Sequence, residues 1–221
     1  MRRLPVPLIA VLGALAFAAA GCGGDETLAR PDKAATLVLD SRPGAVHAGI
    51  ALADERDFDG AEGVHLTVRS PKRSANPLRL LLSGRATFAV LDLHDLVRAR
   101  ARGRDVVAVM GLVQRPAAGV PRLVLAVSRR TLDDDLPVVR AAVRALRRGY
   151  EEALADPESA ISALAALGAE DRVKLTRRFD AVAPKFTAGV RRFGDLDRAS
   201  LRAWARGERP LDVDRAFAFG L

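Results

Sequence analysis

A single cysteine among 221 residues excludes an intrachain disulfide from this protein. Aromatic residues are also scarce, with one tryptophan and one tyrosine, so few side chains are available to stack on nucleic-acid bases. The formal charge is +8, but the arginines are spread along the chain rather than clustered. We therefore expect a solvated arginine-rich surface and no nucleic-acid partner, although this charge is also compatible with attraction to anionic lipids.

The sequence also lacks the motifs of common catalytic centres. It has no phosphate-cradling glycine loop, no nucleophile elbow and no pair of histidines at metal-ligand spacing. Of the three histidines, His65 falls on an outward position of an expected strand, which makes it a surface residue. We therefore expect a protein that is not an enzyme and that carries no cofactor and no metal ion.

The N-terminus indicates export. Arg2 and Arg3 precede an uncharged, largely apolar stretch over 4–21 that ends in small residues, and this pattern predicts a signal peptide at 1–21. Cys22 follows directly, and "AAGC" resembles the lipobox of bacterial lipoproteins, with Ala19 where leucine is usual. The resemblance implies lipidation at Cys22 and an extracytoplasmic location on the cell membrane. An uncleaved membrane anchor and a buried structural thiol are the alternatives.

The next residues, 22–34, are polar and rich in turn formers, which predicts a flexible tether. Over 35–128, short β-branched runs alternate with helical patterns, and this alternation predicts an α/β fold with an open, mainly parallel sheet. The expected strands are 36–40, 64–68, 87–91 and 105–113. The last part, 129–221, reads as a C-terminal helical segment, with helices opening at Pro137 and after Asp156.

Polar side chains follow the ends of three expected strands. His47 follows the first, Ser70 the second, and Asp92, His94 and Asp95 the third. Ligands bind beyond the carboxyl ends of parallel strands, so we expect these residues to line one concave edge of the sheet. Structural roles are equally consistent: Asp92 as an N-cap, Asp95 as an acid balancing the helix dipole, and His47 as a local hydrogen-bonding partner in its turn.

Two long segments carry a family resemblance: "LVLDSRPGAVHAGIALADERDFDGAEGVHLTV" and "SGRATFAVLDLHDLVRARARGRDVVAVMGLVQRP". They resemble the substrate-binding lipoproteins of ABC importers in the pyrimidine and thiamine-precursor group, which are relatives of the nitrate, sulfonate and taurine binders. Asp40, Pro43, His47 and Gly49 match the family's first-strand motif. The resemblance implies a type II periplasmic-binding-protein-like fold, a pyrimidine-like small polar solute and an ABC permease as partner, and it adds Asp40 and Ser41 to the site.

The sequence departs from this family in two places. Ser41 stands where the motif usually has a tryptophan, so the aromatic platform for a ring is absent there. Family members also place a second lobe between the strand ending near Gln114 and the next strand, 123–127, where only about eight residues link the two here. We therefore expect that strand to return antiparallel to the same sheet, leaving a single lobe that binds solute weakly.

Two further readings concern function. The wider superfamily includes pyrimidine synthases that use pyridoxal phosphate and need a lysine near the third strand, where this chain has Leu91. This argues against that enzyme class. A lipoprotein that kept the one-lobe scaffold for interaction and lost transport is the alternative to a solute-binding protein.

Overall fold

The structure of the protein is a computed structural model that describes residues 32–71, 76–115, 119–169, 171–207 and 211–221. The predicted signal peptide, Cys22 and most of the predicted tether lie outside these ranges. Among the described residues, no helix combines the length and the apolar character needed to cross a membrane.

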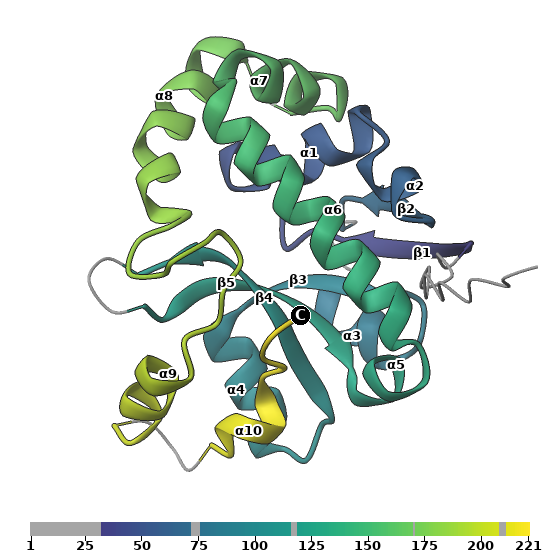
Figure 1. Cartoon of the computed structure of the whole chain (residues 1–221), viewed down its shortest axis with the longest axis vertical. Coiled ribbons are helices and arrows are strands. Elements are labelled where there is room, and N and C mark those ends of the chain that lie inside the picture. Colours follow the sequence, from purple (N-terminus) through teal and green to yellow (C-terminus); the bar gives the residue numbers. More distant parts are fainter. Residues whose placement is uncertain (1–31, 72–75, 116–118, 170, 208–210) are drawn as a thin grey trace, which may run out of the picture.

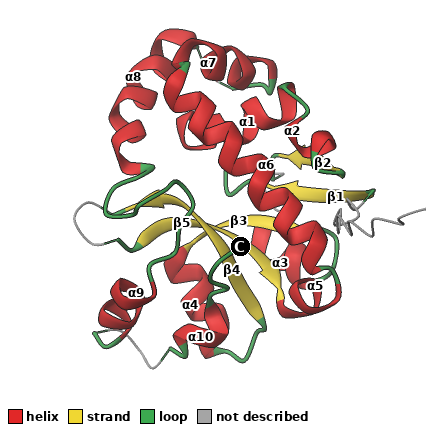
Figure 2. Ribbon diagram, in the orientation of Figure 1, coloured by secondary structure: helices red, strands yellow, loops and turns green. Residues whose placement is uncertain are grey.

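Five strands form one sheet in the order β2-β1-β3-β5-β4 (Figures 1 and 2). They are β1 (Lys33–Val38), β2 (Val64–Arg69), β3 (Phe88–Asp92), β4 (Val106–Gln114) and β5 (Pro121–Ser128). β1 pairs in parallel with both β2 and β3, whereas β5 is antiparallel to both β3 and β4. β1, β2, β3 and β4 therefore run in the same direction, and β5 runs in the opposite one. The predicted α/β fold with an open, mainly parallel sheet is confirmed.

β5 fills the gap between β3 and β4. Its Val124 pairs with Leu91 of β3 and with Gly111 of β4, so the strand is bonded on both sides. The backbone N–H of Arg115, just after β4, donates to the carbonyl of Val120, just before β5, at 2.8 Å. The antiparallel return predicted from the short linker is confirmed, and both strands are almost wholly buried because helices cover both faces of the sheet.

The connections are helical. Between β1 and β2 the chain forms three helical pieces, and Asp57, whose backbone is left-handed (φ 52°), separates the second piece from the third. A short helix at 129–134 precedes the helix that opens near Pro137. In chain order the helices are η1 (Ala45–His47), α1 (Ala48–Glu55), α2 (Phe58–Ala61), α3 (Pro77–Leu82), α4 (Leu93–Ala101), α5 (Arg129–Asp134), α6 (Leu136–Ala155), α7 (Pro157–Ala166), α8 (Arg172–Val182), η2 (Ala183–Lys185), α9 (Arg198–Ala205) and α10 (Val213–Ala216).

The helices form two layers, one on each face of the sheet (Figure 1). The larger core joins α1, α6, α7 and α8 to one face, and a smaller core joins α3, α4, α9 and α10 to the other. α6 illustrates how a helix packs on the sheet with one apolar face. Its Val139, Val143 and Leu146 are buried at helical spacing, whereas Arg140 and Arg144 are exposed. The C-terminal helices thus supply part of both layers.

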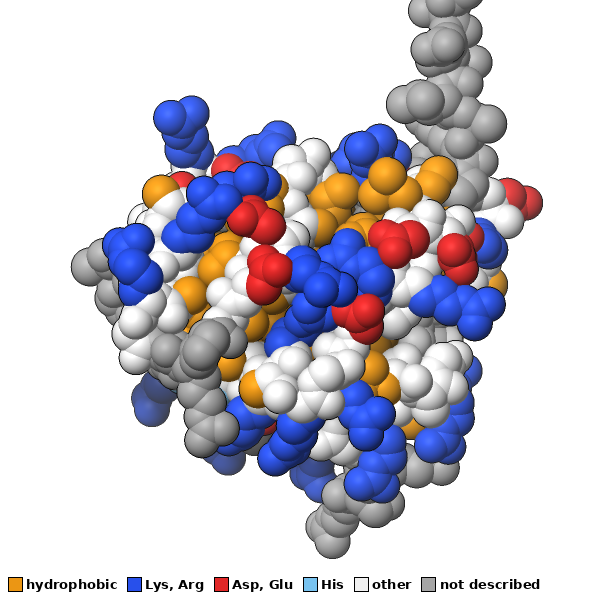
Figure 3. Space-filling model, turned by 90° about the horizontal axis from the view of Figure 1, so that it is seen from below, with side chains coloured by type: hydrophobic (Ala, Val, Ile, Leu, Met, Phe, Trp, Pro, Cys, Tyr) orange, Lys and Arg blue, Asp and Glu red, His pale blue; other side chains and the backbone are white. Residues whose placement is uncertain are grey.

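The face formed by α4, α9 and α10 carries Lys and Arg side chains over much of its area, with Asp and Glu among them (Figure 3). Asp214 of α10 pairs with Arg198 and Arg202 of α9, so these charges tie two short helices together. Exposed pairs of this kind contribute little stability. They are consistent with the solvated arginine-rich surface expected from the composition.

Candidate functional site

The sheet has a topological switch point between β1 and β3. The chain leaves β1 through α1 on one face to reach β2, and it leaves β3 through α4 on the opposite face to reach β4. The helices after β1 and β3 therefore diverge at the carboxyl edge of these neighbouring strands. In open α/β sheets this is the position at which ligands bind, and it is our candidate site.

His47 anchors the turn after β1. Its side chain is only 1% exposed, and both ring nitrogens are engaged. Nδ1 accepts a hydrogen bond from the backbone N–H of Gly44 at 3.2 Å, so Nε2 carries the proton and donates to Asp40 Oδ1 at 2.7 Å. Since no ring nitrogen remains for a ligand, His47 holds the turn and orients Asp40.

Asp40 is the polar side chain that the His47 turn leaves partly exposed to solvent. Burial raises the pKa of its carboxyl, but the hydrogen bond from His47, together with a backbone hydrogen bond and the charge of Arg122, outweighs burial and leaves the pKa below its ordinary value. The carboxylate is therefore ionised at neutral pH. Its side chain is 29% exposed, and Oδ1 is the oxygen that His47 holds. Such a group can accept hydrogen bonds from a solute.

Tyr150 supports the turn from α6. Its hydroxyl donates to the carbonyl of Val46 at 2.6 Å, and its ring stacks on Phe193 with centroids 4.1 Å apart. Burial raises the pKa of this hydroxyl far above its ordinary value, so it stays a donor. Gly49 makes the contact possible, because a Cβ there would lie 2.1 Å from Tyr150 Cγ. The close approach of α1 to Tyr150 therefore explains why residue 49 is a glycine.

Ser41 and Ser70 are both exposed. Ser41 lies next to the carboxylate, with Oγ 3.5 Å from Asp40 Oδ1 and 3.3 Å from the carbonyl of Arg42. Ser70 follows β2, the outer strand, so β1 separates it from the switch point. Of the two predicted serines, the structure brings only Ser41 to the candidate site.

Asp92 and Asp95 have structural partners. Asp92 is the N-cap of α4, and its Oδ1 accepts from the backbone N–H of His94 at 2.8 Å. Asp95 lies in the first turn of the helix and pairs with Arg98, one turn further on. Both structural interpretations drawn from the sequence are therefore observed, and neither carboxylate needs a solute to satisfy it.

His94 lies on the other side of the switch point from His47, because α4 packs on the opposite face of the sheet. Its Nε2 accepts from Arg115 Nη2 at 2.6 Å, and its ring meets Trp204 edge to face at 6.1 Å. The structure thus brings His47 and His94 to the same edge of the sheet but on opposite faces.

Sequence reasoning missed Gln114 and Arg115 at the end of β4. Gln114 is 1% exposed, and its Oε1 lacks a hydrogen-bond partner among the described residues, as does the buried Arg115 Nε. Unsatisfied buried polar atoms are uncommon and mark a place that water or a solute can satisfy. The available clue was a polar Gln-Arg pair that ends an otherwise apolar strand.

No cluster of three or more His, Cys, Asp or Glu side chains suited to a metal ion occurs within the described ranges. The polar groups at the switch point are instead the ionised carboxylate of Asp40, the hydroxyl of Ser41 and the nearby guanidinium of Arg122. This chemistry suits hydrogen bonding to a small polar molecule, and it includes no activated nucleophile.

Comparison with known proteins agrees with this fold. Residues 45–122 match the family described as NMT1/THI5 like. The formylaminopyrimidine-binding protein of Halalkalibacterium halodurans is 30% identical over 80 residues, which are 36% of this chain and 24% of that protein. The chain therefore matches about a quarter of this curated relative. The resemblance to the pyrimidine and thiamine-precursor group inferred from the sequence is confirmed over this part.

Two solved structures extend the similarity to most of the chain. The alkanesulfonate-binding protein SsuA of Xanthomonas axonopodis pv. citri, bound to MOPS, superposes with a TM-score of 0.64 at 12% identity, covering 87% of this chain and 100% of that one. The periplasmic aliphatic sulphonate binding protein SsuA of Escherichia coli gives 0.63 at 9% identity, covering 86% and 93%. At these identities the likeness concerns the fold alone. By its sheet order and these superpositions, the chain has the α/β fold of periplasmic binding proteins.

Proposed function

We propose that this protein is the extracytoplasmic solute-binding component of an ABC importer, that it takes a pyrimidine, a thiamine precursor or a related small polar solute, and that it is not an enzyme. The observation that carries the proposal is the ionised Asp40 carboxylate at the switch point, held there by His47. The similarity of 45–122 to the NMT1/THI5-like family and to a formylaminopyrimidine-binding protein supports the same class.

The charge of Asp40 favours one solute chemistry over another. A carboxylate accepts hydrogen bonds, so it matches the amino and ring N–H donors of an aminopyrimidine. It repels a sulfonate or nitrate at close range unless a cation intervenes. Ser41 adds a second small polar group beside Asp40. We therefore place an aminopyrimidine ring edge at Asp40 and Ser41, with His47 as a positioning residue.

Affinity should be low, because only a short connection joins β4 to β5 where the usual cleft has its second wall. Two-lobed binders close over their ligand and contact it from both sides. If about half of the contacts are missing, a dissociation constant near 1 μM becomes one near 1 mM. The missing ring platform at Ser41 weakens stacking further.

Calorimetric titration of the unlipidated protein tests this proposal. We expect a formylaminopyrimidine to bind with a dissociation constant of about 1 mM and Asp40→Asn to weaken it, whereas the matched variant Asp95→Asn should bind as the wild type does. An alkanesulfonate such as MOPS should bind less well. A submicromolar constant would overturn the one-lobe model, and equal loss in both variants would remove Asp40 from the site.

The same short connection between β4 and β5 favours a second candidate function. A chain that presents one wall of a cleft can serve as an interaction lipoprotein, docking on a membrane partner through its basic surface. No measurable binding of any pyrimidine up to about 10 mM, together with co-purification with a membrane protein other than a permease, would favour this role. Genes for a permease and an ATPase beside this one would favour transport.

We also propose that 1–21 is a cleaved signal peptide, that Cys22 is lipidated and anchors the protein to the cell membrane, and that the residues from Cys22 to the start of β1 form a tether to the folded part. The tether expected over 22–34 is shorter than predicted, because Lys33 and Ala34 already pair with β2. The sole cysteine directly after the apolar stretch supports this arrangement. Cys22→Ser expressed in a bacterial host should leave the membrane fraction. A variant that stays there, processed as the wild type is, contradicts the lipid anchor.

A further inference from the structure

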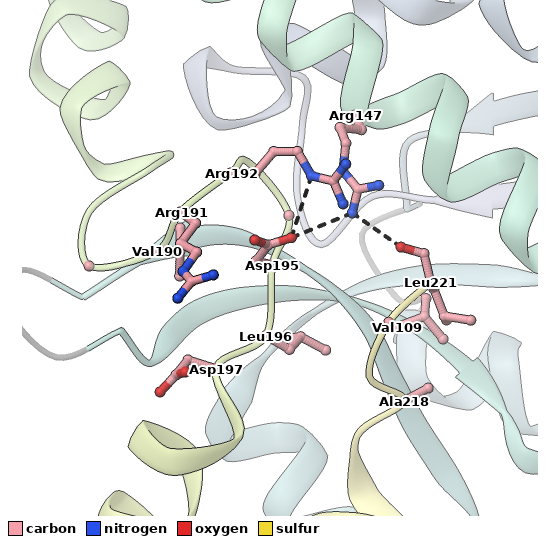
Figure 4. A pocket seen from close by; sticks show the side chains of 13 residues that line it. Val109, Arg147, Val190, Arg191, Arg192, Asp195, Leu196, Asp197, Ala218 and Leu221 are labelled. Atoms are coloured by element: carbon pink, nitrogen blue, oxygen red, sulfur yellow. Dashed lines mark hydrogen bonds and ion pairs between the residues drawn. The ribbon is translucent and has the colours of Figure 1, made fainter.

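The cavity beside the outer edge of β4 is balanced in charge (Figure 4). Positive and negative groups line it in equal number: Arg147, Arg191 and Arg192, and the carboxylates of Asp195, Asp197 and the terminal Leu221. Asp195 lies within ion-pair distance of both Arg147 and Arg192, at 3.8 Å and 3.7 Å, and Arg147 also contacts Leu221. This cavity therefore needs no ligand to satisfy its charges.

A groove of about 490 Å³ between α3 and the end of α4 differs, because its charged side chains have one sign only. Among the described residues, three arginines and no Asp or Glu line it; they are Arg79, Arg102 and Arg104. All three are exposed, and within the described ranges none of their guanidinium groups forms a hydrogen bond or an ion pair. The groove thus has three positive charges without a partner.

The negative groups close to these arginines do not balance them. Asp105 follows Arg104 directly, but its Oδ1 accepts a hydrogen bond from Arg100 and pairs with that guanidinium. The C-terminus of α4 contributes only a partial negative charge to the groove. An anion from outside the chain is therefore the partner that the three arginines can accept.

Apolar side chains also line this groove. They are Leu78 and Leu82 of α3 and Ala99 of α4, and Leu82 is 39% exposed. A small soluble anion gains nothing from an exposed leucine. At the surface of a bilayer, however, phosphate groups lie next to the first methylene groups of the acyl chains, so arginines and a leucine on one surface match both layers.

The groove lies near the edge of the sheet at which the parallel strands begin. Ser83, which lines it, comes shortly before β3, and Arg104 comes shortly before β4. Lys33, the first residue of β1, pairs with Asp135, and Asp135 lines an adjoining cavity together with Leu82 and Ser83. The groove is therefore next to the point at which the chain enters the fold.

From the unpaired arginines, the exposed Leu82 and this position, we propose that the groove is a membrane-docking surface that holds the headgroups of anionic phospholipids. Guanidinium groups bind phosphate oxygens in pairs of hydrogen bonds. Ten residues, 23–32, separate Cys22 from Lys33, so a lipid on Cys22 would keep this edge within about 40 Å of the bilayer. Docking by this edge turns the carboxyl edge, with Asp40, away from the membrane. The orientation rests on the proposed lipid anchor, whereas the contact with phospholipid does not.

Sedimentation of the unlipidated protein with vesicles tests this surface without the anchor. We expect binding to vesicles of equal parts phosphatidylglycerol and phosphatidylcholine, and none to phosphatidylcholine alone. The double variant Arg79→Gln/Arg104→Gln should weaken binding about 25-fold, because each arginine at an anionic membrane contributes a factor of about five. Binding should also weaken as the salt concentration rises.

The matched control is Lys174→Gln/Arg177→Gln, which removes the same charge from exposed positions of α8. α8 packs in the other helical layer and lies on the opposite side of the molecule from β1 (Figure 1). Charges farther than about 10 Å from the lipid headgroups are largely screened at moderate salt, so this control should bind within about twofold of the wild type.

Absence of binding to the anionic vesicles, or an equal loss in the two double variants, overturns the proposal. Release of the protein by glycerophosphate at about 1 mM, which is too dilute to change the screening, also overturns it, because the groove would then take a soluble phosphate. Asp40→Asn should leave vesicle binding unchanged, and the anchor is tested separately by fractionation of Cys22→Ser. Failure of this surface is therefore distinguishable from failure of the solute site or of the anchor.

Discussion

His47 and His94 follow two neighbouring strands of the sheet, yet their surroundings differ. His47 is buried in a turn that it makes itself, since its partners Asp40 and Gly44 lie within seven residues of it. His94 is half-buried, and its partners Arg115 and Trp204 come from the end of β4 and from α9. One histidine stabilises a local turn, whereas the other joins distant segments across the opposite face.

This difference shows that a position at the carboxyl edge of a parallel sheet does not by itself make a histidine available to a ligand. Both histidines lie where ligands bind in such folds, but only the hydrogen-bond partners decide whether a ring nitrogen is available. His47 has neither nitrogen free and acts through Asp40. The predictions below separate the two sides of the switch point by stability, beginning with the largest effect.

The strongest test concerns the helix contact behind His47. Gly49→Ala should lower the free energy of unfolding by about 3 kcal/mol or more, because the new Cβ would lie 2.1 Å from Tyr150 Cγ and force α1 from α6. Urea denaturation measures this change. The control is Gly44→Ala in the same turn, where a Cβ meets only the Arg42 carbonyl at 3.8 Å and stability should change by less than about 1 kcal/mol. Similar losses in both variants would contradict the close-packing argument.

Replacing each histidine compares the two sides directly. His47→Ala should cost about 3 kcal/mol, because it leaves a buried N–H without a partner and opens a cavity, whereas His94→Ala should cost about 1 kcal/mol. Urea unfolding of both variants at neutral pH gives the difference. If His94→Ala proves the more destabilising, the contacts of His94 with Arg115 and Trp204 contribute more to stability than the turn that His47 holds.

Asp40 makes the His47 side sensitive to acid. Because its folded-state pKa is lowered, its contribution to stability is fully present above the unfolded-state pKa of about 3.9 and is lost as the pH falls through the folded-state pKa. Asp40→Asn should therefore be about 2 kcal/mol less stable than the wild type near pH 7, with the gap closing below about pH 4. Unfolding curves over this range test the sign, and a gap that widens in acid would contradict it.

The smallest effects belong to the start of α4. Asp92→Ala should cost about 1 kcal/mol because it removes the N-cap hydrogen bond to His94, and Asp95→Ala should cost less than about 0.5 kcal/mol because its pair with Arg98 is exposed. Thermal or urea unfolding distinguishes the two. Asp92→Asn is the control, since asparagine also caps helices, and a loss as large as that of Asp92→Ala would remove the capping explanation.

Much of this fold could be predicted from local pattern. Alternation in 64–68 placed Val64 and Leu66 inside and His65 outside, as observed, because the pleat of a strand sends successive side chains to opposite faces. Asn76 and Asp156 each precede a proline, a pattern typical of a helix start, and the side chain of each accepts a backbone hydrogen bond as an N-cap. The short linker after Gln114 was enough to predict an antiparallel return.

The candidate site was only partly predictable. The sequence indicated that His47 follows the first strand, and the family resemblance added Asp40, but neither showed that both ring nitrogens of His47 are used, since this depends on the conformation of the turn. The cavity beside β4 joins Arg147 of α6 to Arg192, Asp195 and the segment near 218, which are far apart in the chain. No periodicity links such positions, and only packing brings them together.

The sequence by itself determined the strands, the helix caps and the short connection after β4, because these depend on spacing and composition within short stretches. Tertiary structure decided the rest: that His47 and His94 lie on opposite faces, that Gly49 lets α1 approach Tyr150, and that two arginines share Asp195. The physical reason is that crossover direction and helix contact set these distances, and both are properties of the assembled layers rather than of any one segment.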